Sequence, residues 1–252
     1  MCIPPLLYLL ATGVAASTEA PLQLDHLVQE ALRHSSNSAA APLEQRKLVS
    51  RVKQAYVRLQ HAYRAQESIE SDRQLLRSLL RVAEANYSSG KGLEQDALKA
   101  QVRISLLEPR LIETQSELRA QEAELNAFLG RPRDSALARP ANNSPQALAV
   151  TLEELQAKAG ADAPSDIIRE DYRIAEVAAA QWNVYERTIL PQARFAAHAS
   201  LVAYESGASD FLNPLADYTA LIDAEKKRDD QELDFSLALV RIEELTGVEL
   251  IH

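Results

Sequence analysis

The chain has 252 residues, with 27 Lys and Arg against 36 Asp and Glu, which gives a formal net charge of −9 at pH 7. This acidity argues against nucleic acid as a partner, because binding to a phosphate backbone needs a basic face. One Cys and five scattered His argue against a disulfide framework, a metal site or a cofactor site. Seven Gly and 5% aromatic residues, with abundant Ala, Leu, Glu, Gln and Arg, predict an all-α protein.

Residues 1–17 form the first segment, in which an apolar run from Ile3 to Ala16 ends in small residues. The run is shorter than the roughly 20 apolar residues that cross a bilayer as a helix. It resembles the core of a signal peptide, although no basic stretch precedes it. We therefore expect an exported chain with no membrane-spanning segment after removal of this leader; the alternative is a poorly ordered tail.

The rest of the chain is an internal repeat with an offset of 117 residues. The turn Tyr87-Ser88-Ser89-Gly90 recurs as Tyr204-Glu205-Ser206-Gly207, and Gly130 recurs as Gly247. Each half begins with a similar lead-in segment, 22–27 or 150–155, which predicts a short helix. These matches predict three parts after the leader, namely a repeat 1 hairpin at 18–130, a linker at 131–147 and a repeat 2 hairpin at 148–252.

Four long helices are expected within the two halves, at 42–88, 93–129, 164–206 and 209–246. From Ala97 to Phe128, steps that alternate three and four residues meet a sustained apolar seam, which is typical of a coiled coil. The same register, shifted by 117, runs from Pro214 to Leu245 and is more polar in its middle. Pro109 and Pro191 fall inside arms, where each should interrupt its helix.

Glycines are predicted to end these arms. Gly90 and Gly207 fall in the turns that join the arms of each hairpin, and Gly130 and Gly247 follow the descending arms as C-terminal caps. The expected architecture is thus all-α, with two internally repeated long antiparallel coiled-coil helical hairpins and short lead-in helices.

The order and spacing of these motifs resemble the TolC-like outer-membrane efflux protein family. The resemblance covers roughly residues 22–250 and rests on Tyr-x-x-Gly, on a coiled-coil arm that ends in Leu-x-x-Phe-Leu-Gly-Arg-Pro, on the lead-in Leu-x-Leu-Asp/Glu-x-Leu, and on the duplication of this pattern. Residues 188–193 and 203–212 are similar to the second-repeat hairpin of family members from heavy-metal and multidrug tripartite pumps. The resemblance implies a trimeric α-helical tunnel in the periplasm below an outer-membrane β-barrel, coupled to a periplasmic adaptor (membrane fusion) protein and an inner-membrane pump.

The chain departs from that family pattern where barrel strands should precede each hairpin. Only residues 35–41 and 160–163 separate the lead-in segments from the long helices. A membrane-spanning strand needs about 9 to 11 alternating residues. We therefore expect a shortened member with no β-barrel, placed in the periplasm or cell envelope, whereas the family location is the outer membrane.

The resemblance also implies which residues are functional. The adaptor-contacting tips would be formed by Gly90, Lys91, Gly92, Gly207, Ala208 and Ser209. Asp96 and Asp210 are candidates for a pore constriction, and the alternative is that each stabilises the first turn of a helix. The charged run 225–230 is expected to form a surface face.

The expected function is a transport component that assembles with itself as a homotrimer or with intact homologues, because the resemblance spans nearly the whole chain after the leader. The alternatives are a periplasmic coiled-coil scaffold and a non-functional remnant of a channel. An enzyme is not expected, because no phosphate loop, nucleophile–base pair or ligand cluster is found. Surface chemistry should separate the first two, since a tunnel subunit has apolar sides toward its neighbours and a solitary bundle is polar all round.

Overall fold

The computed structural model describes residues 21–35, 42–141, 148–159 and 163–251. The predicted signal peptide at 1–17 lies outside these residues, as does the part of the predicted linker at 142–147. The boundaries of the leader, the two repeats and the linker therefore remain predictions.

Helices make up nearly all of the described residues. No β-strand is assigned among these residues, where the only bridge pairs Leu22 with Pro140. The elements in chain order are α1 (Leu24–Ser35), α2 (Pro42–Ser88), α3 (Glu94–Ser105), α4 (Leu107–Phe128), α5 (Leu152–Ala159), α6 (Ser165–Val184), the π-helix η1 (Tyr185–Ile189), α7 (Leu190–Glu205) and α8 (Leu212–Thr246). This order confirms the predicted all-α fold with two long hairpins.

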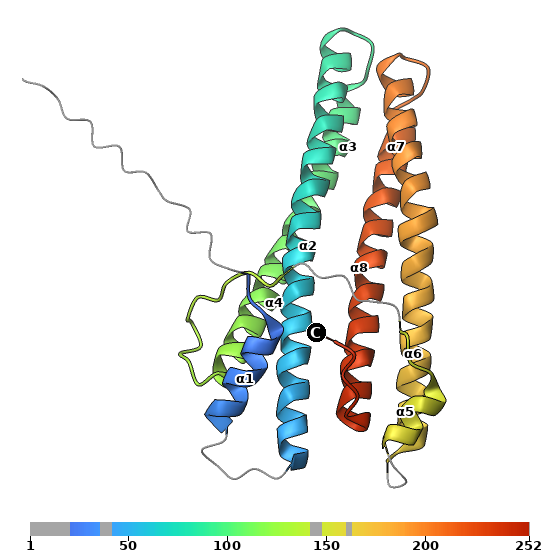
Figure 1. Ribbon diagram of the computed structural model, residues 1–252. Coiled ribbons are helices and arrows are strands. Elements are labelled where there is room, and N and C mark those ends of the chain that lie inside the picture. The colour runs from blue at the N-terminus through green and yellow to red at the C-terminus, as the bar shows by residue number, and fades with distance from the viewer. Residues whose placement is uncertain (1–20, 36–41, 142–147, 160–162, 252) are drawn as a thin grey trace, which may run out of the picture.

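The long helices stand side by side as four columns (Figure 1). Below the tips, the order across the molecule is α4, then α2, then α8, then α6, and nearer the tips α3 lies behind α2 in this view. The turns of both hairpins lie at the same end, and the short helices α1 and α5 pack on the long helices toward the other end. The two hairpins therefore meet through α2 and α8, and the outer columns have no further column beyond them among the described residues.

Each hairpin has one continuous arm and one interrupted arm. The continuous arms, α2 and α8, are the inner columns, and the interrupted arms are the outer ones. Proline explains both interruptions, because its ring clashes with the carbonyl four residues earlier. Pro109 lies four residues after Ser105, the last residue of α3, and Pro191 lies four residues after Arg187 in η1. The predicted interruptions are confirmed.

The predicted seams face the interior. Every seam position from Ala97 to Phe128 and from Pro214 to Leu245 is buried or half-buried. The inner helix α8 buries a second face as well, because it packs on α2 on one side and on α6 and α7 on the other. Tyr218, Ile222, Asp229 and Glu232 belong to this second face and are buried.

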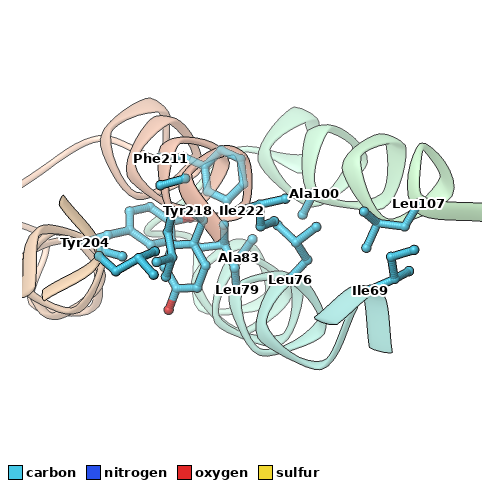
Figure 2. Packing of buried hydrophobic residues seen from close by; sticks show 14 residues of the cluster. Ile69, Leu76, Leu79, Ala83, Ala100, Leu107, Tyr204, Phe211, Tyr218 and Ile222 are labelled. Carbon is cyan, nitrogen blue, oxygen red and sulfur yellow. The ribbon is translucent and has the colours of Figure 1, made fainter. Parts of the chain in front are cut away.

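The core nearest the tips is shared by the two repeats (Figure 2). Leu76 and Leu79 of α2 lie in the same cluster as Tyr218 and Ile222 of α8, and full burial of a leucine side chain contributes about 1.5 to 3 kcal/mol. The rings of Tyr204 and Phe211 meet edge to face in this cluster, with centroids 5.4 Å apart and an interplanar angle of 67°. Two further clusters fill the bases of the two repeats, one in each.

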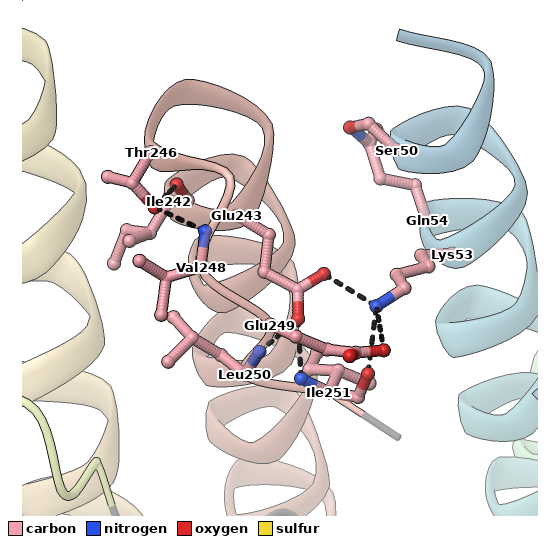
Figure 3. Close-up of polar contacts among 10 residues, drawn as sticks. All are labelled: Ser50, Lys53, Gln54, Ile242, Glu243, Thr246, Val248, Glu249, Leu250 and Ile251. Atoms are coloured by element: carbon pink, nitrogen blue, oxygen red, sulfur yellow. Dashed lines mark hydrogen bonds and ion pairs between the residues drawn. The ribbon is translucent and has the colours of Figure 1, made fainter. Parts of the chain in front are cut away.

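A polar clamp joins the repeats at the base (Figure 3). The Nζ atom of Lys53 on α2 donates to Glu243 on α8 at 2.8 Å and to the carbonyl of Ile251 at 2.8 Å. The second carboxylate oxygen of Glu243 accepts the backbone N–H groups of Leu250 and Ile251. Lys53, Glu243 and the segment 248–251 therefore fix α2 to α8 far from the tips.

Candidate functional site

The two tips share a pattern of backbone hydrogen bonds, to which the first tip adds a bond from the N–H of Gly92 to the carbonyl of Asn86. Gly90 and Gly207 have φ of 72° and 77°, in the left-handed region that favours glycine. The N–H of Lys91 donates to the carbonyl of Asn86, and the N–H of Ala208 donates to the carbonyl of Ala203, both at 2.8 Å. Together with the bonds from the glycine N–H groups, these form a Schellman motif at each tip. The internal repeat therefore extends to the hydrogen bonds of the turns.

The predicted tip residues are brought together at one end of the molecule (Figure 1). Gly90, Lys91, Gly207 and Ala208 are exposed, and Gly92 and Ser209 are half-buried. Apart from the two neighbours in the chain, no atom of the described residues lies within 4 Å of where a Cβ would stand at Gly90 or Gly207. The tips thus present bare backbone that another helical hairpin could approach closely.

The two acidic candidates occupy different environments. Asp96, in the first turn of α3, is buried, and its charge acts on the neighbouring hydroxyl of Tyr204. Asp210 is exposed, and its Oδ1 accepts the N–H groups of Leu212 at 3.0 Å and Asn213 at 3.3 Å. Asp210 therefore caps the start of α8, and the structure places it apart from Asp96 in burial and in hydrogen bonding.

The tip tyrosines match in sequence and differ in environment. Tyr204 is 5% exposed in the shared core, whereas Tyr87 is 50% exposed. Burial raises the pKa of Tyr204 above the usual value. The repeat in sequence therefore does not extend to the burial of the two tyrosines.

Two apolar stripes, which were not predicted from the sequence, run along the outer columns. The first stripe consists of Leu98, Val102, Leu106 and Ile112 on α3, α4 and their junction, and the second consists of Val177, Val184, Phe195 and Val202 on α6 and α7. All eight side chains are exposed, and Phe195 is 77% exposed. The heptad spacing between Val177 and Val184, and again between Phe195 and Val202, is the signal that could have revealed the second stripe.

The charged run 225–230 is only partly a surface face, which corrects the prediction. Asp229 is buried, and Glu225 and Arg228 are half-buried between the columns. Arg228 donates to Glu186 of η1 at 2.9 Å and to Asp229 at 2.7 Å. The inner position of α8 explains the difference, because a helix with neighbours on two sides buries residues outside its coiled-coil seam.

A buried carboxyl on α2 faces this charged run. Asp72 contacts Glu225, and its burial and the charge of Glu225 raise its pKa to about 7, while Arg110 of α4 opposes the rise. Burial likewise raises the pKa of Asp229. Carboxyls from both hairpins thus meet midway along the seam between α2 and α8.

Neither a metal site nor a membrane span is found in the described ranges. No group of three or more His, Cys, Asp or Glu side chains there is placed to hold a metal ion. Within the same residues, every helix is too short or too polar to cross a bilayer.

Comparison with solved structures identifies the fold. The outer-membrane channel OprN superposes with a TM-score of 0.69 at 14% identity, over 90% of this chain and 71% of OprN. The outer-membrane protein VceC of Vibrio cholerae gives 0.67 at 14% identity, over 88% of this chain and 74% of VceC. CusC, described for its transmembrane channel formation, gives 0.68 at 15% identity, over 90% of this chain and 74% of CusC. The chain has the fold of a TolC-like efflux channel.

The TolC-like fold agrees with the resemblance found in the sequence. No family model matches the chain, and no curated protein matches it. The likeness is therefore carried by the arrangement of the helices, and two of the matched proteins, OprN and CusC, are described as channels.

Proposed function

We propose that the chain is a component of a tripartite export system, in which it forms part of the wall of a periplasmic helical tunnel. It assembles edge to edge as a homotrimer, or with intact homologues, and its tips bind a periplasmic adaptor that connects to an inner-membrane pump. The protein works in the periplasm or cell envelope. The TolC-like fold and the paired tips support this proposal.

The two apolar stripes carry the proposal. They lie on the interrupted arms, one stripe on each hairpin, and an exposed apolar stripe on each hairpin suits a head-to-tail ring of copies. A periplasmic scaffold that works alone would be expected to have polar residues at these exposed positions, because they would face water. The stripes therefore favour the tunnel over the scaffold.

Residues on the two stripes lie at matching distances from the tips of their hairpins. Val102 lies as far along the chain after Gly90 as Phe195 lies before Gly207, so each is about 18 Å from its tip. Ile112 and Val184 form a second matched pair, each about 34 Å from its tip. Copies side by side at the same level would bring Val102 near Phe195 and Ile112 near Val184.

Cysteine crosslinking tests the assembly. Val102→Cys in one copy and Phe195→Cys in another should form an intermolecular disulfide in the chain that lacks residues 1–17, and sedimentation should show a trimer. The matched control pairs Val102→Cys with Val184→Cys, whose heights differ by about 16 Å, and it should not crosslink. A compact monomer with no height-selective crosslink would contradict the tunnel and favour the scaffold or remnant.

A charge on one stripe provides an independent test of the same interface. Phe195→Lys should reduce trimer formation at least tenfold in sedimentation experiments and leave the helicity of the single chain unchanged, because the side chain is exposed there. Gln192→Lys adds the same charge at another exposed position of α7 and should have little effect. Equal loss of assembly in both variants would point to net charge rather than to the stripe.

The tips are tested by adding bulk. The double variant Gly90→Val, Gly207→Val strains two left-handed turns and fills bare backbone, so we expect crosslinking to the adaptor to be abolished with helicity nearly unchanged. Gly247→Val is the matched control, since Gly247 has φ of 70° at the far end of α8 and a Cβ there would meet only Arg46, at 3.8 Å. No adaptor crosslink by the wild-type chain, co-expressed with its pump partners, would remove the transport role.

Asp210 and Asp96 would have different roles at the tunnel entrance. Asp210 is exposed beside the second tip, where its charge would disfavour anions at the tunnel entrance. Asp96 is buried in the single chain and would contribute to a pore constriction only if the tips move apart.

A further inference from the structure

The carboxyl contact between α2 and α8 lies at the level of both helix interruptions. Asp72 lies as far along the chain before Gly90 as Glu225 lies after Gly207, so both are about 27 Å from the tips. The junction of α3 and α4 at Leu106 and the π-helix η1 fall close to the same level on the outer arms. The seam between the hairpins is thus polar at the level where both outer arms are interrupted.

Asp72 lacks the partners that a buried carboxylate needs. The residue is 1% exposed, and its Oδ2 atom meets no hydrogen-bond donor in the described part of the chain. Its contact on α8 is Glu225, which is itself an acid. A buried carboxylate without donors is costly, whereas a protonated carboxyl can donate its O–H to the carboxylate beside it.

The other two acids of the contact have cationic partners. Glu225 accepts from Arg194 of α7 at 3.0 Å, and Asp229 accepts from Arg228 at 2.7 Å. Arg228 opposes the rise that burial causes in the pKa of Asp229. Asp72 has no ion pair in the described residues, so it is the member of the three that keeps a proton.

The surrounding charges come from every neighbouring element. They are Arg110 and Glu108 of α4, Glu225, Arg228, Asp229 and Glu232 of α8, Glu186 of η1, Arg194 of α7, and His61, Arg64, Glu70 and Arg73 of α2. Arg73 is bound to Glu70 and Glu108, and Arg64 to Glu232. The cation acting directly on Asp72 is Arg110, whose effect is smaller than that of Glu225.

We propose that Asp72 and Glu225 form a proton-dependent latch between the two hairpins. When Asp72 is protonated, its O–H donates to Glu225 and holds α2 against α8. When Asp72 loses its proton to solvent, the carboxylates of Asp72, Glu225 and Asp229 repel one another and the seam loosens. The latch belongs to the single chain and does not depend on the proposed tunnel.

Loosening at this level would act on the tips. The Lys53–Glu243 clamp holds α2 to α8 at the base, and the outer arms are interrupted at the height of the latch. The hairpin ends above the latch would then depend on the apolar core that they share, while the clamp keeps the base closed. Solvent reaches the neighbours of Asp72, because Asp229 lines grooves that also contain Arg110 on one side and Glu225 on the other.

The stability that Asp72 adds to the folded chain should fall as pH rises. A carboxyl that holds its proton more tightly in the folded chain than in the unfolded chain adds stability at low pH, and this stability is lost as pH rises through the folded-state value. The pKa of Asp72 is raised from 3.8 to about 7. The contribution of the latch should therefore decline between about pH 4 and pH 7.

Infrared difference spectroscopy of the full chain detects the protonated acid directly. We expect a C=O stretch of a buried carboxylic acid at pH 6 that is lost with a midpoint near neutral pH and is absent from Asp72→Asn. Asp171→Asn is the control, because Asp171 is also buried but accepts from Arg241 at 2.6 Å, and this variant should keep the band. Absence of the band from the wild type at pH 6, or its persistence in Asp72→Asn, would overturn the proposal.

Two further measurements test the role of Glu225 and the loosening of the seam between α2 and α8. Glu225→Gln removes the neighbouring charge and should move the midpoint of the band down by about one pH unit; an unchanged midpoint would remove Glu225 from the latch. Amide exchange near Leu76 and Ile222 at pH 8.5 should be at least tenfold faster in the wild type than in Asp72→Asn, where the side chain stays neutral. Equal exchange rates would show that ionisation does not loosen the seam.

Discussion

Asp210 is the side chain by which the two tips differ most in their capping. Its carboxylate binds the first free N–H groups of the descending arm in repeat 2, and no side chain caps α3 in repeat 1, where Leu93 occupies the position before the helix. An exposed acid at a helix start also interacts favourably with the helix dipole. The stabilising role of Asp210 thus holds with or without a role in a pore.

Asp210→Ala should lower the free energy of unfolding by about 1 kcal/mol, because two backbone N–H groups lose their acceptor. Asp210→Ser keeps an acceptor and should lose less than half as much. Urea unfolding monitored by circular dichroism measures both values. Equal losses for the two variants would show that the charge of Asp210, and not its cap, matters.

Replacement of Lys53 should lower the stability of the whole chain. Lys53→Met leaves Glu243 charged and unpaired between α2 and α8, and we expect a loss of about 3 kcal/mol in urea unfolding. Lys47→Met breaks an exposed pair with Glu44 on the same helix and should cost no more than about 0.5 kcal/mol. Similar losses in both variants would contradict the clamp.

At the scale of elements, the contrast between continuous and interrupted arms should govern local opening. The amides of α2 and α8 should exchange most slowly, because these helices are continuous and have neighbours on two sides. The amides near Leu106 and in η1 should exchange at least tenfold faster than those of α8 at the same height. Hydrogen exchange resolved by residue measures this, and uniform protection across the four columns would contradict it.

The sequence predicted the helices well because glycine and proline determine where they end. The predicted turns at Gly90 and Gly207 and the interruptions near Pro109 and Pro191 are all found. The order of the columns could not be predicted, because a heptad seam defines one buried face and gives no information about a second. The burial of Asp229 follows from that order.

The candidate site was likewise predictable only in its local features. The two turns were predicted from local signals, the role of their six residues was implied by the resemblance, and the structure places both turns at one end of the molecule. The environment of Asp96 includes Tyr204, which belongs to the other repeat and is distant in the sequence. The edge stripes could be recognised as edges only once α2 and α8 were known to be the inner columns.

At the scale of the whole molecule, the core near the tips makes the repeats depend on each other. Residues 18–141 alone would expose Leu76 and Leu79, and residues 148–252 alone would expose Tyr218 and Ile222. We expect each fragment to unfold without a cooperative transition, and the mixture to regain at least half of the helicity of the intact chain. Circular dichroism during thermal unfolding measures this; a cooperative transition of either fragment alone would show that the repeats are independent.

The left-handed glycines limit how the chain can change in length. The interval from Gly90 to Gly130 equals the interval from Gly207 to Gly247, so the descending arms of the two repeats have the same length. One residue inserted into a single arm would raise its tip by about 1.5 Å and rotate it by about 100°, so the apolar seam would turn away from its partner. A whole heptad added to each of the four arms would keep both the seams and the level of the tips. Natural length variants of this protein should therefore differ by whole heptads, added to both repeats together.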